Sequence, residues 1–134
     1  KVIPGETVGI KFIGNLSISD NTIHYKYKFG GGVVGADGNV YGIPSDADRA
    51  IRINIAEETV DEIGPRMVCK NKWQNGYSAR DGCVYCIPCD ADAILRINPF
   101  AENEEDHVTT IGGPLTEGSE KWEGGVVGPD GCMY

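Results

Sequence analysis

The feature that most constrains this chain is an internal repeat of glycine, apolar and turn-forming residues. The segment from Lys28 to Pro44 returns from Lys72 to Pro88, and it begins a third time from Lys121 to Tyr134. The starts at positions 28, 72 and 121 are separated by 44 and 49 residues. Periods of roughly 40–50 residues in a strand-rich unit are typical of β-propeller blades. The repeat therefore predicts an array of similar units.

The first half of each unit is predicted to be a β-hairpin. A glycine- and valine-rich strand, Gly31–Gly35 in the first unit, leads through an Asp-Gly pair to a second strand, Asn39–Pro44. We expect the Asp-Gly pair to form the centre of a type I′ turn, where both residues need positive φ. The pairs in the three units are Asp37 and Gly38, Asp81 and Gly82, and Asp130 and Gly131.

Two further strands complete the predicted unit. In the third strand, apolar residues alternate with polar ones around Arg52, which recurs as Arg96; this alternation indicates a half-buried strand. The fourth strand ends in an Ile-Gly pair, at Gly64 and again at Gly112. The predicted fold class is all-β, a β-propeller segment of four-stranded antiparallel blades.

The whole chain can be divided in this register. Residues 1–27 are predicted to hold the end of a preceding blade and a linker, because Lys1–Pro4 resembles a third strand and Ile10–Gly14 a fourth. Residues 28–71 and 72–120 are then one blade each, and residues 121–134 start a further blade. The predicted domain is a single propeller segment of half a blade, two blades and half a blade.

The repeated residues also resemble known proteins. Lys-Trp-x-Gly-Gly-Val with Pro-Asp-Gly-Cys-x-Tyr occurs at 121–134, and Tyr-x-Ile-Pro-x-Asp-Ala-Asp at 85–92, before Leu-Arg-Ile-Asn-Pro. The pattern resembles uncharacterised propeller-repeat proteins of algae and other unicellular eukaryotes, and more distantly kelch-like and YVTN-like propellers. The resemblance implies the fold but no particular activity, because propellers include hydrolases, lectins and scaffolds.

Charge and hydropathy exclude some classes of partner. The formal net charge is −8, and no basic stripe with interleaved aromatic residues is present, so nucleic acid is not an expected partner. No apolar run approaches the roughly 20 residues of a membrane-spanning helix. We expect a soluble protein, and the sequence leaves its compartment, cytoplasmic or secreted, undecided.

The cysteines have two readings. Cys83, Cys86 and Cys89 occupy repeat positions that hold small or medium residues elsewhere, so packing as small apolar side chains is the favoured interpretation. A disulfide or a metal site is the alternative. Five is an odd number, so any scheme of disulfides within the chain leaves one thiol unpaired.

Paired aspartates recur in the loop between the second and third strands. Asp46 and Asp48 in the first unit correspond to Asp90 and Asp92 in the second. We expect the first aspartate of each pair to cap its turn and the second to pair with Arg52 or Arg96. The alternative is a Ca²⁺ ion, which takes several oxygen ligands. No cofactor is otherwise expected.

Large aromatic residues recur once per unit. Phe29, Trp73 and Trp122 share one position, and a tyrosine recurs in the second strand. Packing between blades is the favoured role for these rings. The alternative is a carbohydrate-stacking platform at Trp73 and Trp122.

These features favour a scaffold or binding module that makes protein–protein or assembly contacts through the propeller rim that carries the two aspartate loops, with Asp46 and Asp48 and with Asp90 and Asp92. One alternative is a lectin-like carbohydrate-binding module, and another is a calcium-dependent lactonase or esterase. An enzyme is less expected, because no catalytic motif is present. About three blades do not close a propeller. We therefore expect a longer chain, a protein partner or a second copy to complete it, with Lys121–Tyr134 paired to a segment like Val2–Gly14.

Overall fold

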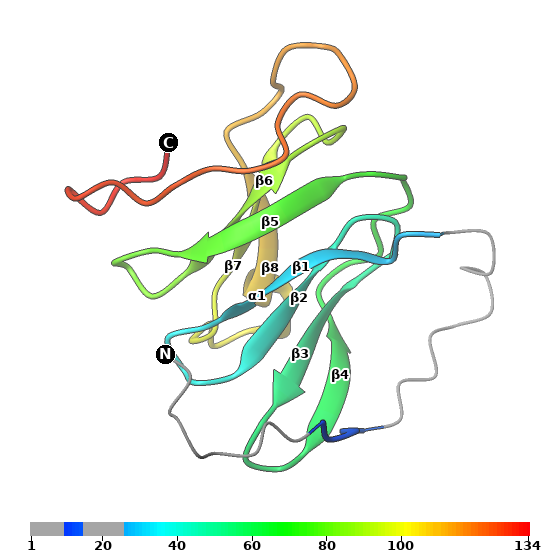
Figure 1. Ribbon diagram of the computed structural model, residues 1–134, viewed down its shortest axis with the longest axis vertical. Coiled ribbons are helices and arrows are strands. Elements are labelled where there is room, and N and C mark those ends of the chain that lie inside the picture. The colour runs from blue at the N-terminus through cyan, green and yellow to red at the C-terminus, as the bar shows by residue number, and fades with distance from the viewer. Residues whose placement is uncertain (1–9, 15–25) are drawn as a thin grey trace.

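The two complete repeat units, residues 28–71 and 72–120, each form a four-stranded antiparallel sheet (Figure 1). The computed structural model describes residues 10–14 and 26–134. In both sheets the strands are ordered as in the sequence, β1-β2-β3-β4 and β5-β6-β7-β8, so each sheet is a meander. The strands are β1 (Phe29–Val34), β2 (Val40–Pro44), β3 (Ala50–Asn54), β4 (Thr59–Ile63), β5 (Trp73–Ser78), β6 (Val84–Pro88), β7 (Ile94–Ile97) and β8 (Val108–Ile111). The all-β class is confirmed.

Residues at equivalent repeat positions pair in the same way in the two sheets. Tyr41 pairs with Arg52 in the first sheet, and Tyr85 pairs with Arg96 in the second. The first strand is irregular at the same place in both units, between Phe29 and Gly32 in β1 and between Gln74 and Gly76 in β5. A bulge at an equivalent site indicates a repeated structural feature.

The hairpin turns differ from the predicted type I′. Gly38, Gly82 and Gly131 have φ near +80°, but the aspartates before them do not have positive φ. The Gly35 amide donates to the Asn39 carbonyl at 2.8 Å, so three residues form the loop. This is a type I turn followed by a glycine bulge. The Asp37 carboxylate accepts a hydrogen bond from the Asn39 amide at 3.2 Å, and this Asx contact suits an aspartate with negative φ.

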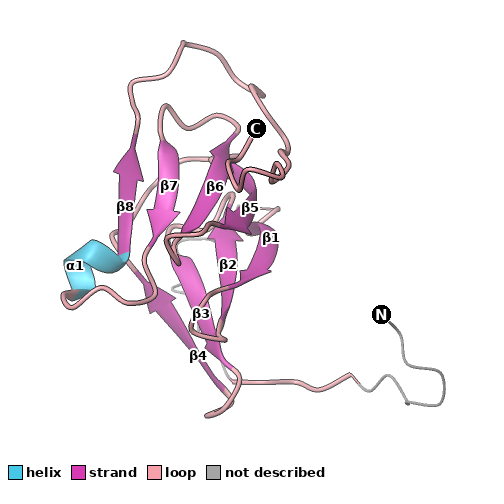
Figure 2. Cartoon of the chain, turned by 90° about the vertical axis from the view of Figure 1, so that its left-hand side faces the viewer, coloured by secondary structure: helices cyan, strands magenta, loops and turns pink. Residues whose placement is uncertain are grey.

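The second unit has a longer connection between its third and fourth strands. Ile53 pairs with Val60, seven positions away, whereas Ile97 pairs with Val108, eleven positions away. The additional residues include the short helix α1 (Glu104–His107), which lies beside β8 (Figure 2). The prediction of strands and turns alone missed this helix, which has no buried residue and therefore no apolar stripe in the sequence.

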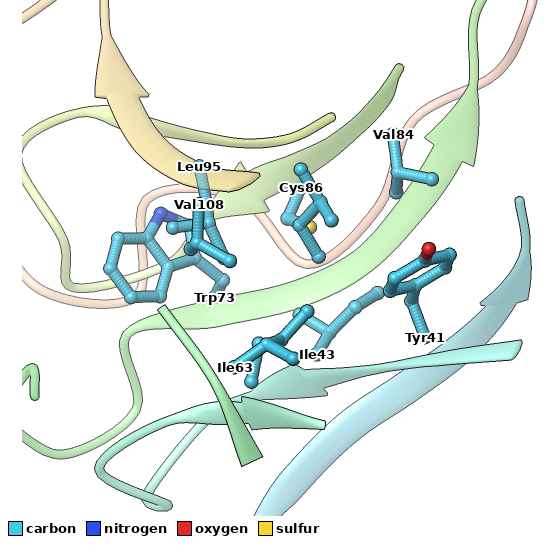
Figure 3. Packing of buried hydrophobic residues seen from close by; sticks show 10 residues of the cluster. Tyr41, Ile43, Ile63, Trp73, Val84, Cys86, Leu95 and Val108 are labelled. Atoms are coloured by element: carbon cyan, nitrogen blue, oxygen red, sulfur yellow. The ribbon is translucent and has the colours of Figure 1, made fainter. Parts of the chain in front are cut away.

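The core lies between the two sheets (Figure 3). β1 and β5, the first strands of the two units, contact each other (Figure 1). Tyr41 and Trp73, which are 2% and 4% exposed, belong to one apolar cluster, and this confirms packing as the role of these two aromatic rings. The other members of the cluster are Ile43, Ala50, Ile63, Val84, Cys86, Leu95, Ile97 and Val108.

Candidate functional site at the unit junctions

The junction between the first and second units is held by a buried lysine. Lys72 precedes β5 and is 3% exposed. Its Nζ donates to the carbonyls of Ser45, Ala47 and Cys69 at 2.8, 2.9 and 2.8 Å. Burial lowers the pKa of this ammonium, and the nearby Cys69, Asp48 and Asp46 partly oppose that shift. Three carbonyl acceptors satisfy all three donors of the ammonium group.

Asp46 joins the same two units. Its Oδ2 accepts a hydrogen bond from the Tyr27 amide at 3.1 Å, and its Oδ1 accepts one from the Asn71 amide at 2.9 Å. Tyr27 and Asn71 each precede the first strand of a unit, so one carboxylate connects consecutive units. The predicted role for Asp46, a cap on its own turn, is wrong. The contacts come from residues 19 and 25 positions away, which the turn chemistry of the loop does not reveal.

Asp48 pairs with an arginine, but not with the predicted Arg52. Its Oδ2 lies 2.7 Å from Arg66 Nε, and the side chain is 9% exposed. Arg52 instead lies 3.3 Å from Asp61, on the neighbouring strand β4. The prediction failed because Arg52 lies within β3, where Tyr41 and Asp61 are its cross-strand partners. The loop that contains Asp48 instead contacts the β4–β5 connection, where the Met67 amide donates to the Asp48 carbonyl.

The second unit repeats only part of this arrangement. Asp90 Oδ1 accepts a hydrogen bond from the Glu120 amide at 2.5 Å, as Asp46 does from the Asn71 amide. Asp92, the counterpart of Asp48, is exposed. Lys121 Nζ donates to the Gly118 carbonyl at 2.9 Å, which matches only the Cys69 contact of Lys72.

The four predicted aspartates do not converge. Asp46 borders one surface depression, while Asp90 and Asp92 border another. Within residues 10–14 and 26–134, no group of three or more His, Cys, Asp or Glu side chains is placed to hold a metal ion. The carboxylate oxygens of Asp46 are both used by backbone amides. Ca²⁺ binding remains a hypothesis that this geometry does not favour.

An Asp–Tyr pair recurs in the first hairpin of each of the three described units. The hydroxyls of Tyr41, Tyr85 and Tyr134 donate to Asp37, Asp81 and Asp130 at 2.8, 2.6 and 2.8 Å. Burial, followed by the Asp37 hydrogen bond, raises the pKa of Tyr41. For Tyr85 and Tyr134 the hydrogen bond to the aspartate is the larger cause of a raised pKa. The pair joins the turn to the second strand.

We expect these tyrosines to ionise above the ordinary tyrosine pKa of 10.0. Absorbance titration of the folded chain should show this delay, and Asp81→Ala should shift the Tyr85 transition to lower pH while leaving Tyr41 unchanged. Because the unfolded chain loses these protons first, the stabilisation is complete below pH 10 and decreases above it. An unchanged Tyr85 titration in Asp81→Ala would contradict the assignment.

The cysteines are free thiols, and three of them are core residues. Cys83, Cys86 and Cys89 are 2%, 0% and 1% exposed, while Cys69 and Cys132 are exposed. Burial raises the pKa of the Cys86 thiol, which opposes formation of the reactive thiolate. The packing interpretation is confirmed for these three.

The third unit docks on the second as the second docks on the first. The Lys121 amide donates to Cys89 O at 3.1 Å, as the Lys72 amide does to Ser45 O. A Cβ at Gly125 would lie 3.4 Å from Ile87 Cδ1, and one at Gly76 would lie 2.8 Å from Ile43 Cδ1. Val126 and Tyr134 exchange two backbone hydrogen bonds, so this segment is a hairpin.

The second junction leaves an apolar cavity of about 260 Å³. Trp122 is 47% exposed at its edge, whereas Trp73 is buried and donates from Nε1 to the Ala93 carbonyl at 2.8 Å. Ile63 is 8% exposed, but its repeat counterpart Ile111 is 40% exposed. Residues that line the cavity include Ile87, Ile94, Leu115, Trp122, Met133 and Tyr134. Of these residues, the repeat pattern had identified Trp122 and Tyr134 as recurring aromatic positions.

Comparison with known proteins gives no assignment. No protein-family model, curated protein or solved structure matches this chain. In the part of the chain that the structure describes, no helix has the length and apolar character needed to cross a membrane.

Proposed function

We propose that this chain is a β-propeller-type scaffold that functions in assembly through contacts between repeat units. The observation that carries the proposal is the apolar face of the second sheet, which residues 121–134 cover only in part: Ile111 is 40% exposed and a cavity of about 260 Å³ is left. The equivalent face of the first sheet is packed against a neighbouring unit, with Ile43 and Ala50 fully buried. A face that has a packed counterpart in the same chain is suited to receive strands of similar shape.

The recurrent polar residues support a scaffold over an enzyme. Lys72, Asp46 and Asp48 direct their side chains at backbone groups or at Arg66, and each of these contacts joins segments of the junction. Side chains with these partners stabilise the stacking of units.

The sheet face is better suited to assembly than the rim. Asp46 and Asp48, which were expected to present the rim to a partner, are each 7% exposed. The cavity at the second junction, in contrast, is bordered by exposed Trp122 and Tyr134. Partly exposed aromatic residues beside an apolar pocket are enriched at protein interfaces.

A peptide with the chain's own third and fourth strands tests this proposal. Residues 93–112 include β7 and β8 and contain no tryptophan. We expect this peptide to bind the 134-residue chain saturably and to shift Trp122 emission to shorter wavelength, because the indole becomes buried. Trp73 is already buried and should contribute a constant background.

The matched control is the same peptide with Leu95→Asp and Val108→Asp. Both residues are buried in the first junction, at 0% and 1% exposure, so the charged peptide should not bind. Equal binding of the two peptides, or no binding of the native peptide, would contradict an assembly function of this face.

The exposure of Trp122 also favours a second candidate, a carbohydrate-binding module. An indole that is 47% exposed beside Tyr134, itself 72% exposed, can stack on a sugar ring. Trp73 cannot serve in this way because it is buried, so only one such site remains of the two in the original hypothesis. A glycan array with wild type and Trp122→Ala distinguishes the two functions, since only the carbohydrate module gives glycan binding that requires Trp122.

A further inference from the structure

We propose that a second copy of this chain completes the cover over the apolar face of the second sheet, with its Ile10 packed against Gly112. The inference rests on the proposed assembly function and names its partner. It follows from a contact between a glycine and an apolar residue of the next unit, which is present at Gly14 and Gly64 but not at the equivalent Gly112.

The recurring contact is defined by Gly64. This residue ends the first sheet with φ of +76°, and a Cβ built on it would lie 2.4 Å from Val108 Cβ. Val108 begins β8 and is 1% exposed. The glycine therefore provides the space that the first residue of the next unit's fourth strand fills.

The same contact occurs one unit earlier in the chain. Gly14 has φ of +68°, and a Cβ on it would lie 2.7 Å from Val60 Cγ2. Val60 lies in β4 at the repeat position of Val108, since the two pair with Ile53 and Ile97 respectively. Residues 10–14 thus lie where the end of a preceding unit is expected, although the predicted third strand at Lys1–Pro4 is outside the described residues.

Gly112 has the same backbone conformation but lacks the apolar neighbour. Its φ is +68°, and the nearest described atom to an added Cβ is Ile94 Cδ1 at 4.0 Å, within its own sheet. The position that Val108 fills beside Gly64, and Val60 fills beside Gly14, is unfilled beside Gly112 in residues 10–14 and 26–134.

Ile10 is the residue that fits this position. It stands at the start of the fourth-strand sequence Ile10–Gly14, at the same repeat position as Val60 and Val108. It is 90% exposed, whereas Val108 is 1% exposed. One chain therefore has both an unfilled glycine site and an exposed apolar residue of the matching repeat position.

Reciprocal exchange makes the assembly closed. Ile10 of each copy packs against Gly112 of the other, so the two junctions are identical and related by a two-fold axis.

The test is the mass of the 134-residue chain in solution, by sedimentation over a range of concentrations. We expect a dimer of twice 14.4 kDa. Ile10→Glu should raise the dimer dissociation constant by about 100-fold or more, because it places a carboxylate in an apolar site. Circular dichroism should remain that of the wild type, since Ile10 is 90% exposed in the single chain.

Phe12→Glu is the matched control. Phe12 is 95% exposed, and its repeat counterparts are the polar, exposed residues Glu62 and Thr110. We therefore expect the dimer dissociation constant of Phe12→Glu to lie within about threefold of the wild-type value. This is a change well under the 1.4 kcal/mol that corresponds to tenfold. Equal weakening by both variants would indicate non-specific apolar association and would overturn the proposal.

Mixing two defective variants tests the pairing itself. Ile10→Glu and Ile111→Glu should each be monomeric, but their mixture should form a heterodimer through the one junction that keeps Ile10 and the native β8 face. A wild-type chain that stays monomeric, or a mixture that does not associate, overturns the second-copy proposal. If the 93–112 peptide still binds in that case, the assembly function itself remains supported.

Discussion

Replacing Lys72 with Met is expected to lower the free energy of unfolding by about 2–4 kcal/mol. Methionine keeps most of the side-chain volume but removes the donors to Ser45 O, Ala47 O and Cys69 O. The Ser45 carbonyl keeps one bond, from the Lys72 amide at 3.1 Å. The other two lose their Nζ donor: the Ala47 contact is buried and the Cys69 contact is part-buried. A buried acceptor without a partner is destabilising by roughly 1–3 kcal/mol. Urea unfolding measures the loss.

Lys121→Met is the matched control for this substitution. Lys121 occupies the same repeat position, is only partly buried, and donates from Nζ to the Gly118 carbonyl. Its replacement should cost about 1 kcal/mol or less. Equal losses in the two variants would show that Lys72 does not hold the first junction.

The Lys72 variant should also change the pH dependence of stability. Burial lowers the folded-state pKa of Lys72 below its ordinary value of 10.5, so the unfolded chain binds more protons between the two values. The free energy of unfolding therefore increases with pH across that interval. Above about pH 10 the ionisation of the tyrosines begins to oppose this increase. Lys72→Met should lack this slope.

The sequence was sufficient to predict the sheets because the determining signals are local. Alternation around Arg52 and Arg96 defined β3 and β7, and the recurrent Asp-Gly pairs placed the turn between the first and second strands of each unit correctly. The type of turn was missed because it depends on whether aspartate takes positive φ. The Asx hydrogen bond from the residue two positions later suits negative φ.

The partners of the loop aspartates could not be predicted from local signals. Asp46 binds amides on two different connections, and Asp48 binds Arg66 rather than the recurrent Arg52. These contacts are determined by how one sheet lies against the next, which neither strand periodicity nor turn chemistry specifies. The lysine at positions 28, 72 and 121 recurs as regularly as the aspartates. It was the available signal for the junction.

The difference between the two junctions also required the structure. Repeat alignment makes Trp73 and Trp122 equivalent, yet the first is 4% exposed and the second 47%. The burial of each ring depends on what the following segments cover, and a single-residue motif does not contain that information. The repeat therefore predicted the two sheets, but not that Trp73 and Trp122 lie in different surroundings.

Gly64→Ala is expected to destabilise the chain by about 3–5 kcal/mol, as measured by urea unfolding. Its positive φ of +76° disfavours any Cβ, and that Cβ would lie 2.4 Å from Val108 Cβ, which is buried. Gly38→Ala isolates the first effect: φ is +82° there, nothing lies within 4 Å, and we expect a loss of about 1 kcal/mol. The excess in Gly64→Ala should therefore measure the contact between units. Combining Gly64→Ala with Val108→Gly should recover about 1–3 kcal/mol relative to additive effects. Additive losses, or equal losses at Gly38 and Gly64, would show that the fourth strands of neighbouring units are not packed as this contact requires.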